Sequence, residues 1–423
     1  MRLVSKKWIF DNLNSQSTIN SSVSYTVKKI IEDIKKNKDK ALLKYVKKFE
    51  NKKATLDNLL ITKKTLKDAY NSLPNETRNS LKLAYKRIYH YHLKQKKISY
   101  SFKDQLDSKF YIEWKPIENV GLYIPGGLAA YPSTVLMTAI PANIARVPNT
   151  MICVPSQNGQ TSDLTLAAAY LCGVKKVYNV GGAQAIAALA FGTKIIKKAD
   201  KVFGPGNQYV AEAKKQLFGV IGVDLPAGPS EVLVIANNKS NPTWIAYDVL
   251  AQGEHDPNAR TYVLSINKNI LIKVKNELKR IMVETNLKNV DLSIKNNCNL
   301  ILAKSQKEIY EISNFIAPEH LHIHKKFNKD MLRNITNAGS VFIGEKSPVA
   351  LGDYTMGTNH VLPTDQAAKF SSGLGVEDFT KKTVFINPGK KTLKKIENHT
   401  INLARQEGLE AHALSVEIRK IKT

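Results

Sequence analysis

Apolar side chains recur at three- and four-residue spacing through the first quarter of the chain. This pattern predicts helices over residues 21–97, interrupted at Pro74, because proline has no backbone N–H with which to continue a helix. Residues 110–114 instead place aromatic and β-branched side chains next to one another, as strands do, and Pro116 ends that strand. Residues 119–124 predict a second strand, and we expect the two strands to form a hairpin.

From residue 123 onward charge thins out, and short apolar runs alternate with glycine turns and helical patterns. Over residues 123–230 the predicted strands are 151–155, 177–180 and 202–203, and the predicted helices are 133–146, 162–172, 183–191 and 208–218. A second run predicts strands at 231–236, 261–266, 299–303, 321–324 and 339–344, and helices at 242–252, 270–284 and 306–316. Such alternation is typical of parallel sheets, so we predict an α/β protein with two Rossmann-like doubly wound domains.

The two runs also suggest how the chain is divided. We predict an N-terminal arm at residues 1–20 and a first α/β domain, with a helical start, made of residues 21–122 and 231–375. The Rossmann-like residues 123–230 are predicted to be inserted into it. The lysine-rich residues 376–423 are helical in pattern, and we expect them to form a C-terminal tail.

Composition narrows the class of protein. The chain has 423 residues, a formal net charge of +27 and three widely spaced cysteines, which argue against a disulfide framework. We find no long apolar run and no secretory signal, so we expect a cytoplasmic protein without a membrane partner. The charge suggests nucleic acid, but it comes mostly from dispersed lysine and little from arginine, which favours a solvated surface and no nucleic-acid partner.

The stretch DVLAQGEHDPN (248–258) holds the first candidate ligands for a metal ion. Gln252 and His255 are three residues apart, which on a helical turn puts both side chains on one face. Asp353 and His412 would complete a set of two nitrogens and two oxygens, a set that suits zinc. Spacing does not prove that four remote residues converge, and the site would be closed only by the folded chain or by a second subunit.

Other stretches carry polar groups with two readings each. Glu319 and His320 precede a predicted strand and could share proton transfers, although a capping histidine beside a solvated glutamate has the same pattern. Asp353 and His360 lie in the glycine-rich loop GDYTMGTNHVLPT, and Glu407 lies near His412 in the tail, where a solvated helix face is the simpler account. Three glycine turns, IPGG, VGGAQ and FGPGN, fit phosphate binding, but none completes GxGxxG.

Taken together, these stretches resemble the histidinol dehydrogenase family. The resemblance is carried, in order along the chain, by VGLYIPGG, NVGGAQAIAALAFGT, FGPGN, DLPAGPSEVLVIA, AQGEHDP, APEHL, GDYTMGTNHVLPT and EGLEAH. It covers nearly everything after residue 111, whereas the helical first hundred residues add little. One small departure is Gly253, where the family usually has alanine; we expect it to add backbone freedom without changing the spacing of the ligands.

The resemblance implies a reaction and a role for each candidate residue. The implied reaction oxidises L-histidinol to L-histidine through the aldehyde with two NAD+, with one zinc ion per subunit holding the substrate. The implied enzyme is a homodimer with intertwined tails, in which the tail is lent to the other subunit. The implied residues are Glu319 and His320 for catalysis; Gln252, His255, Asp353 and His412 for zinc; Tyr123, Gln184 and Asn207 for NAD; and Ser230, Gln252, His255, His320, Asp353, His360, Glu407 and His412 for substrate.

Two alternatives to this reading stay open. A zinc hydrolase would use Glu319 as its base and would need no nicotinamide. A basic nucleic-acid-binding protein would show binding that falls steeply with salt. We expect His320 to be the base for alcohol oxidation and Glu319 to activate the water that attacks the aldehyde.

Overall fold

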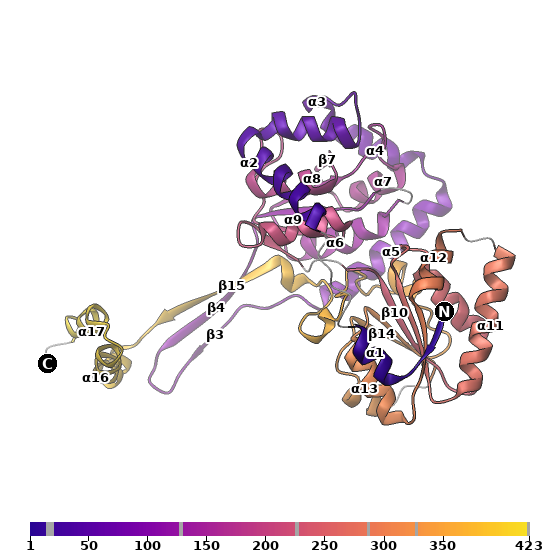
Figure 1. Ribbon diagram of the computed structural model, residues 1–423. Coiled ribbons are helices and arrows are strands. Elements are labelled where there is room, and N and C mark those ends of the chain that lie inside the picture. Colours follow the sequence, from indigo (N-terminus) through magenta and orange to yellow (C-terminus); the bar gives the residue numbers. More distant parts are fainter. Residues whose placement is uncertain (14–20, 127–129, 225–227, 286–287, 326–328, 421–423) are drawn as a thin grey trace.

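The computed structural model describes residues 1–13, 21–126, 130–224, 228–285, 288–325 and 329–420. Two α/β units lie side by side, and a narrow arm extends from them to a pair of helices near the C-terminus (Figure 1). The predicted fold class is confirmed. The predicted arm residues 14–20 and Gly127 of the IPGG turn lie outside the described residues.

The first unit is built on a six-stranded sheet whose order is β2-β7-β6-β5-β8-β9, parallel except for β2. The central strand β5 is buried along its whole length, and the last four residues of β6 are buried as well. The strands are β2 (Leu60–Ile61), β5 (Asn119–Tyr123), β6 (Asn149–Val154), β7 (Lys176–Asn179), β8 (Lys201–Phe203) and β9 (Gly222–Val223).

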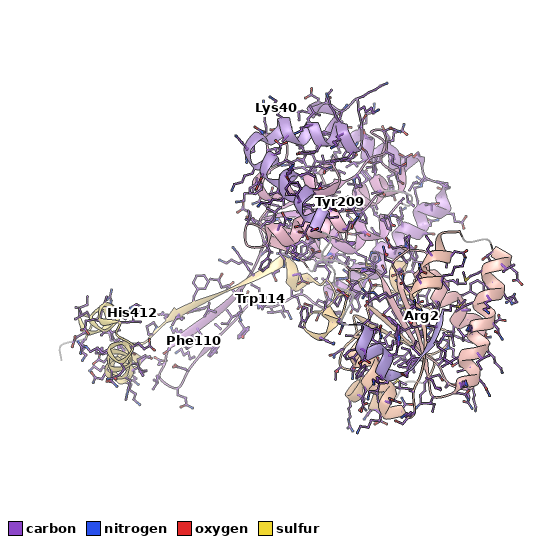
Figure 2. The ribbon with its side chains drawn as sticks, in the orientation of Figure 1. Arg2, Lys40, Phe110, Trp114, Tyr209 and His412 are labelled. Atoms are coloured by element: carbon purple, nitrogen blue, oxygen red, sulfur yellow. The ribbon has the colours of Figure 1, made fainter. Side chains whose placement is uncertain are left out.

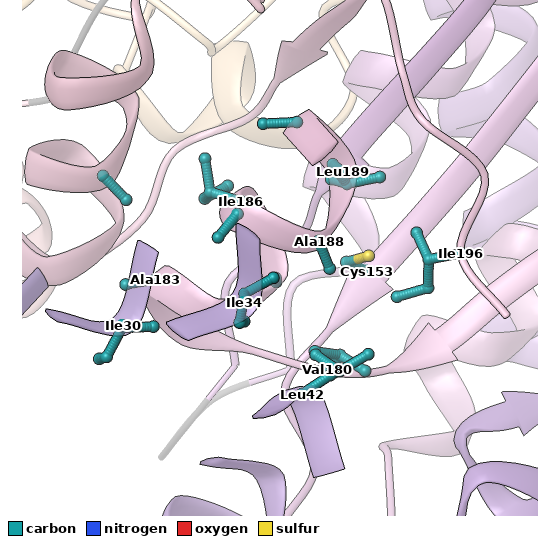
Figure 3. Close-up of a cluster of buried hydrophobic side chains, with 14 of the residues drawn as sticks. Ile30, Ile34, Leu42, Cys153, Val180, Ala183, Ile186, Ala188, Leu189 and Ile196 are labelled. Carbon is teal, nitrogen blue, oxygen red and sulfur yellow. The ribbon is translucent and has the colours of Figure 1, made fainter. Parts of the chain in front are cut away.

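Helices cover both faces of this first sheet. One apolar cluster joins α2, α8 and α9 to the sheet, and Figure 3 shows Ile34 and Leu42 of α2 in this cluster, with Leu42 beside Val180. A second cluster joins α4, α5, α6 and α7 to the other face. The helices are α2 (Ser21–Phe49), α3 (Leu56–Leu59), α4 (Lys63–Ser72), α5 (Asn75–Leu93), α6 (Pro132–Ile144), α7 (Asp163–Leu171), α8 (Gly182–Phe191) and α9 (Gln208–Leu217).

The second unit has a six-stranded, wholly parallel sheet with the order β1-β12-β11-β10-β13-β14. Its strands are β1 (Arg2–Val4), β10 (Glu231–Ile235), β11 (Arg260–Ser265), β12 (Cys298–Leu302), β13 (His320–Ile323) and β14 (Ser340–Ile343). The helices α10 (Pro242–Gly253), α11 (Lys268–Thr285) and α12 (Lys288–Asn297) cover one face, and α1 (Lys6–Leu13), α13 (Gln306–Ile316) and α14 (Lys329–Asn334) cover the other.

The arm is a three-stranded antiparallel sheet with the order β15-β4-β3. Its strands are β3 (Tyr100–Lys103), β4 (Lys109–Pro116) and β15 (Thr380–Asn387). Beyond it, α16 (Lys390–Gln406) and α17 (Glu410–Glu417) pack on each other. Three short elements connect β14 to the arm: α15 (Ala350–Tyr354) and the 3-10 turns Ala367–Lys369 and Val376–Phe379.

The structure corrects the predicted division of the chain. Residues 21–93 pack on the sheet of residues 119–223 and not on the second sheet, because the apolar faces of α2, α4 and α5 contribute to the two clusters of the first unit. The N-terminal segment is not a free arm, since β1 pairs with β12. The predicted hairpin is also wrong: β4 pairs with β3 and β15, whereas β5 joins the parallel sheet. Residues 376–423 are not wholly helical, because β15 lies within them.

Candidate functional site

Glu319 and His320 lie at the amino-terminal edge of the second sheet. Helix α13 ends at Ala317, whose left-handed backbone (φ 47°) turns the chain towards β13. Both side chains are buried, with exposed fractions of 7% and 4%. The Glu319 Oε2 atom accepts a hydrogen bond from the Glu231 backbone N–H at 2.9 Å, so the neighbouring strand β10 holds this carboxylate in place. The predicted pair is therefore a fixed, desolvated group rather than a solvated helix end.

His320 lies between two carboxylates. Its Nδ1 atom is 3.6 Å from Glu319 Oε2, and its Nε2 atom is 3.6 Å from Asp353 Oδ1. Burial lowers the pKa of His320, but the charges of Glu319 and Asp353 and their hydrogen bonds outweigh it and raise this pKa to about 10. Any positive charge that neutralises Asp353 removes part of this attraction and lowers the pKa of His320, which favours the neutral ring that can accept a proton.

The loop of residues 353–360 links this edge to the first unit. His360 Nδ1 is 3.0 Å from the Asp353 carbonyl oxygen, and its Nε2 is 3.3 Å from Thr134 Oγ1 in the first turn of α6. Gly357 makes the turn possible, since it has a φ of +98° and a Cβ there would lie 2.8 Å from the Arg87 carbonyl oxygen. Because both ring nitrogens of His360 are occupied, we assign it to holding the loop against α6.

Helix α10 brings the first two predicted metal ligands to the same region. The helix starts where Asn241 caps it, with Oδ1 accepting the backbone N–H groups of Thr243 and Trp244. Gln252 is buried in its last turn, and no described residue forms a hydrogen bond with its side-chain amide. His255 follows the helix end and is exposed.

Asp353 is the acidic centre of this region. Burial raises the pKa of its carboxyl, but the hydrogen bond and charge of His320 and the charges of His360 and His255 together lower it below its ordinary value. An ionised, largely buried carboxylate surrounded by imidazoles suits a divalent cation of zinc's type. The predicted substrate residue Ser230 lies just before β10. Its backbone carbonyl oxygen accepts a hydrogen bond from the Arg260 backbone N–H at 2.9 Å.

The last two predicted site residues lie elsewhere in the single chain. Glu407 ends α16 and His412 lies in α17, and both are exposed. Figure 2 shows His412 at the far end of the arm, beyond Trp114 and Phe110 and away from both α/β units. One chain therefore does not bring His412 or Glu407 to Asp353, and the predicted ligand set needs a second copy.

The chain is similar to known proteins over nearly its whole length. A family model described as histidinol dehydrogenase matches residues 13–420. The histidinol dehydrogenase of Pelagibacter ubique is 43% identical over 401 residues, 94% of this chain and 92% of the relative. That of Acinetobacter baylyi is 41% identical over 418 residues, 98% of this chain and 97% of the relative. The crystal structure of histidinol dehydrogenase from Elizabethkingia anophelis has a TM-score of 0.93 at 36% identity, covering 99% of this chain and 98% of that one. The chain belongs to the histidinol dehydrogenase family.

Histidinol dehydrogenases use NAD and Zn2+, and the predicted NAD residues lie at the carboxyl ends of the first sheet. Tyr123 ends β5, Gln184 lies in the first turn of α8, and Asn207 caps α9. Strand order reverses at β5 and β8, and open α/β sheets bind their ligands at such a point. Thr134 of α6 follows β5 and reaches His360, so this edge faces the edge that carries His320.

The glycine turns already have acceptors for their N–H groups, which sequence reasoning missed. Glu50, after α2, accepts the N–H groups of Ser156 at 3.0 Å and Gly181 at 2.9 Å, and the Gln184 amide at 3.1 Å. Asp224 accepts the Gly204 N–H at 2.6 Å and pairs with the buried Lys214. Internal carboxylates thus take N–H groups that a complete GxGxxG turn presents to a pyrophosphate. No local pattern marks Glu50 or Asp224, because their partners are remote.

The departure at Gly253 has a packing reason rather than the predicted backbone freedom. A Cβ at Gly253 would lie 2.8 Å from Ser293 Oγ of α12. The Ser293 hydroxyl donates to the Gly253 carbonyl oxygen at 2.8 Å. Because α12 approaches the end of α10 this closely, glycine fits best just after Gln252.

A cavity of about 340 Å³ lies at the opposite, carboxyl-terminal end of the second sheet. Asn237, Gln306 and Lys325 are among the residues that line it, together with apolar side chains of α13. None of the predicted site residues lines this cavity, and the catalytic pair is at the other end of β13. We therefore do not assign it to the substrate.

Glu231 should make stability depend on pH. Burial and the charge of Glu319 raise its pKa to about 8 although Arg260 lies 3.2 Å away, so folding favours the neutral acid. The contribution of the Glu231 carboxyl to the free energy of unfolding is fully present below its unfolded pKa of about 4.3 and is lost as pH rises through 8. We expect Glu231→Gln to lessen the fall in urea midpoint between pH 5 and pH 8. The control Glu284→Gln changes an exposed side chain of α11 and should leave the fall in urea midpoint unchanged. An equal fall in wild type and in Glu231→Gln would contradict the assignment to Glu231.

Proposed function

We propose that the chain oxidises L-histidinol to L-histidine through histidinaldehyde, with two NAD+, as the last step of histidine biosynthesis. The observation that carries the proposal is the buried Glu319–His320 pair facing Asp353 between the two α/β units. When bound, NAD+ accepts the hydrides, and zinc, held by Gln252, His255, Asp353 and His412, holds the imidazole and amine of the substrate. The cytoplasmic location is part of this proposal.

His320 and Glu319 divide the proton transfers between them. His320 accepts the hydroxyl proton while the carbinol carbon loses hydride, which leaves histidinaldehyde. Glu319 then takes a proton from the water that adds to the aldehyde, and the hydrate loses the second hydride to give the carboxylate. The Glu231 N–H keeps Glu319 oriented for this role. The backbone of β10 also contacts the His320 ring, because Nδ1 is 3.3 Å from the Glu231 carbonyl oxygen.

The test is a steady-state assay with purified protein, L-histidinol and NAD+. We expect two NADH for each histidine formed, and loss of activity with a chelator that returns on addition of Zn2+. The alternative, a zinc hydrolase with Glu319 as base, predicts ester or amide turnover and no NADH. The absence of NADH with zinc-loaded protein would reject the dehydrogenase.

We also propose that the active form is a homodimer in which each arm and tail packs on the other subunit. The arm is exposed on both faces, and its large apolar residues have exposed fractions of 58% at Tyr100, 50% at Phe102 and 66% at Ile386. The tail helices expose Leu403 and Ile418 as well. A patch of this kind is typical of a surface that another chain covers. A second copy is the occupant we favour, because the predicted ligand set lacks His412 within one chain.

We do not propose a nucleic-acid or membrane partner. The net charge of +27 is spread along the chain, and no aromatic residues are grouped with arginine in a strip. Among the described residues, no helix has the length and apolar content needed to cross a membrane. Binding to DNA or RNA that fell steeply with salt would reopen the first of these questions.

A further inference from the structure

Three buried polar side chains that are not among the predicted zinc ligands meet between α10 and β13. Asp248 lies one helical turn before Gln252, His322 lies in β13 and is 2.9 Å from Asp248, and His324 directly follows that strand. Their exposed fractions are 8%, 0% and 1%. One ligand atom from each lies within 4.8 Å of the others. None of the three has a role in the proposed reaction.

The hydrogen bonds of His322 leave one nitrogen for an ion. Its Nε2 is 2.9 Å from the Gly344 carbonyl oxygen, which can only accept, so Nε2 carries a proton. Its Nδ1 is 2.9 Å from Asp248 Oδ2, and a neutral ring would point a lone pair at a carboxylate. Either a second proton or a cation must lie between them. Metal-bound histidines commonly donate their outer N–H to a backbone carbonyl in this way.

The surroundings of His324 distinguish a second proton from a cation at this position. Neither of its ring nitrogens has a hydrogen-bond partner, although the side chain is fully buried. Its Nε2 is 3.7 Å from Asp248 Oδ2. A proton between Asp248 and His322 leaves His324 only its 3.7 Å approach to Asp248, which is too long for a hydrogen bond, whereas an ion satisfies all three side chains at once. Such a buried polar group without a partner is unfavourable, so we favour the ion.

The separations of Asp248 Oδ2 from the two imidazoles fit a zinc ion. Ligand atoms about 2.1 Å from a tetrahedral zinc lie about 3.4 Å apart, and the measured 2.9 Å and 3.7 Å fall on either side of that value. Two imidazoles and one carboxylate are a donor set that zinc accepts, with a water in the fourth position. His324 also lines the cavity at the carboxyl end of the second sheet, which gives an ion a route of entry.

We propose that Asp248, His322 and His324 bind a second Zn2+ that ties α10 to β13. Gln252 lies in the last turn of α10 and His320 begins β13, so this ion fixes two elements that carry the predicted site. Its role is structural, and the proposal holds whether or not the chain oxidises histidinol.

The test is the zinc content of the full-length protein, measured by mass spectrometry after dialysis against zinc and then against zinc-free buffer. We expect His324→Leu and His322→Gln each to hold one zinc per chain fewer than wild type, and the control His90→Leu, on an exposed helix position, to equal wild type. Equal zinc content in wild type and both cluster variants would overturn the proposal. A proton shared by Asp248 and His322 would then be the explanation of their contact.

A second measurement avoids changing the cluster itself. Asp353→Ala removes a predicted ligand of the other ion and leaves Asp248, His322 and His324 intact. We expect this variant, reconstituted with Co2+, to keep the visible absorption of a tetrahedral cobalt centre, and His324→Leu combined with Asp353→Ala to lose it. A colourless Asp353→Ala protein would overturn the proposal, and this outcome is independent of any activity.

Discussion

Replacing Glu319 by glutamine should stop the second oxidation while sparing much of the first. Glutamine keeps the shape of the side chain, and its carbonyl oxygen can still accept the Glu231 N–H, but it cannot take a proton from water. General-base catalysis contributes about 10²–10⁴-fold. We therefore expect conversion of histidinaldehyde to histidine to fall at least about a hundredfold, and conversion of histidinol to aldehyde to fall less than about tenfold.

The measurement supplies each substrate separately in single-turnover experiments and follows NADH. His320→Asn serves as the matched control, and it should slow alcohol oxidation at least as much as aldehyde oxidation. Glu284→Gln tests the effect of removing a carboxylate that is remote from the site. If Glu319→Gln slowed both steps equally, the division of proton transfers between Glu319 and His320 would be wrong.

The sequence predicts the two parallel sheets well because their strands are buried on both faces. The strands of residues 231–235 and 260–265 have buried apolar centres, residues 232–235 and 262–264, so this part of their pattern does not depend on which segment lies beside them. Strand β15 gives no such signal. It is exposed along its length and pairs with β4, which is more than 250 residues earlier in the chain. Its lysine-rich pattern therefore resembled the helices that follow it.

The placement of the N-terminal helices was wrong for a related reason. The apolar stripe of α2 predicts that the helix packs on something, but the same stripe fits either sheet. Figure 3 shows that the partners of Ile30 and Ile34 include Ala183 and Ile186 of α8. That choice depends on complementary shape between segments 150 residues apart, which one sequence does not show.

The residues of the candidate site were also predicted only in part from the sequence. Glu319 and His320 were found because a carboxylate and an imidazole stand together at a strand edge within a family motif. Three carboxylates were missed: Glu231, which is buried beside the site, and Glu50 and Asp224, which are partly buried and hold the glycine turns. The last two bond to remote backbone N–H groups, which carry no side-chain signature. Sequence motifs therefore do not reveal carboxylates whose hydrogen-bond partners are backbone N–H groups.

The exchanged tail predicts that two inactive variants regain activity when they are combined. Asp353→Ala removes a ligand from the body of one chain, and His412→Ala removes one from the tail of the other; each variant alone should be inactive. In a mixed dimer with exchanged tails, one site combines the intact body of the His412→Ala chain with the intact tail of the Asp353→Ala chain. That site should have full activity, whereas the other site carries both defects.

Random mixing makes about half of the dimers mixed, and half of their sites are intact, so we expect about a quarter of the wild-type rate. The two variants are unfolded and refolded together, or co-expressed with different tags, and the rate is measured as NADH formed from histidinol. Asp353→Ala mixed with Gln252→Ala is the matched control: both defects lie in the body, so no site becomes whole and no activity should return. If each tail served its own body, the first mixture would also stay inactive, because every site would then keep one defect.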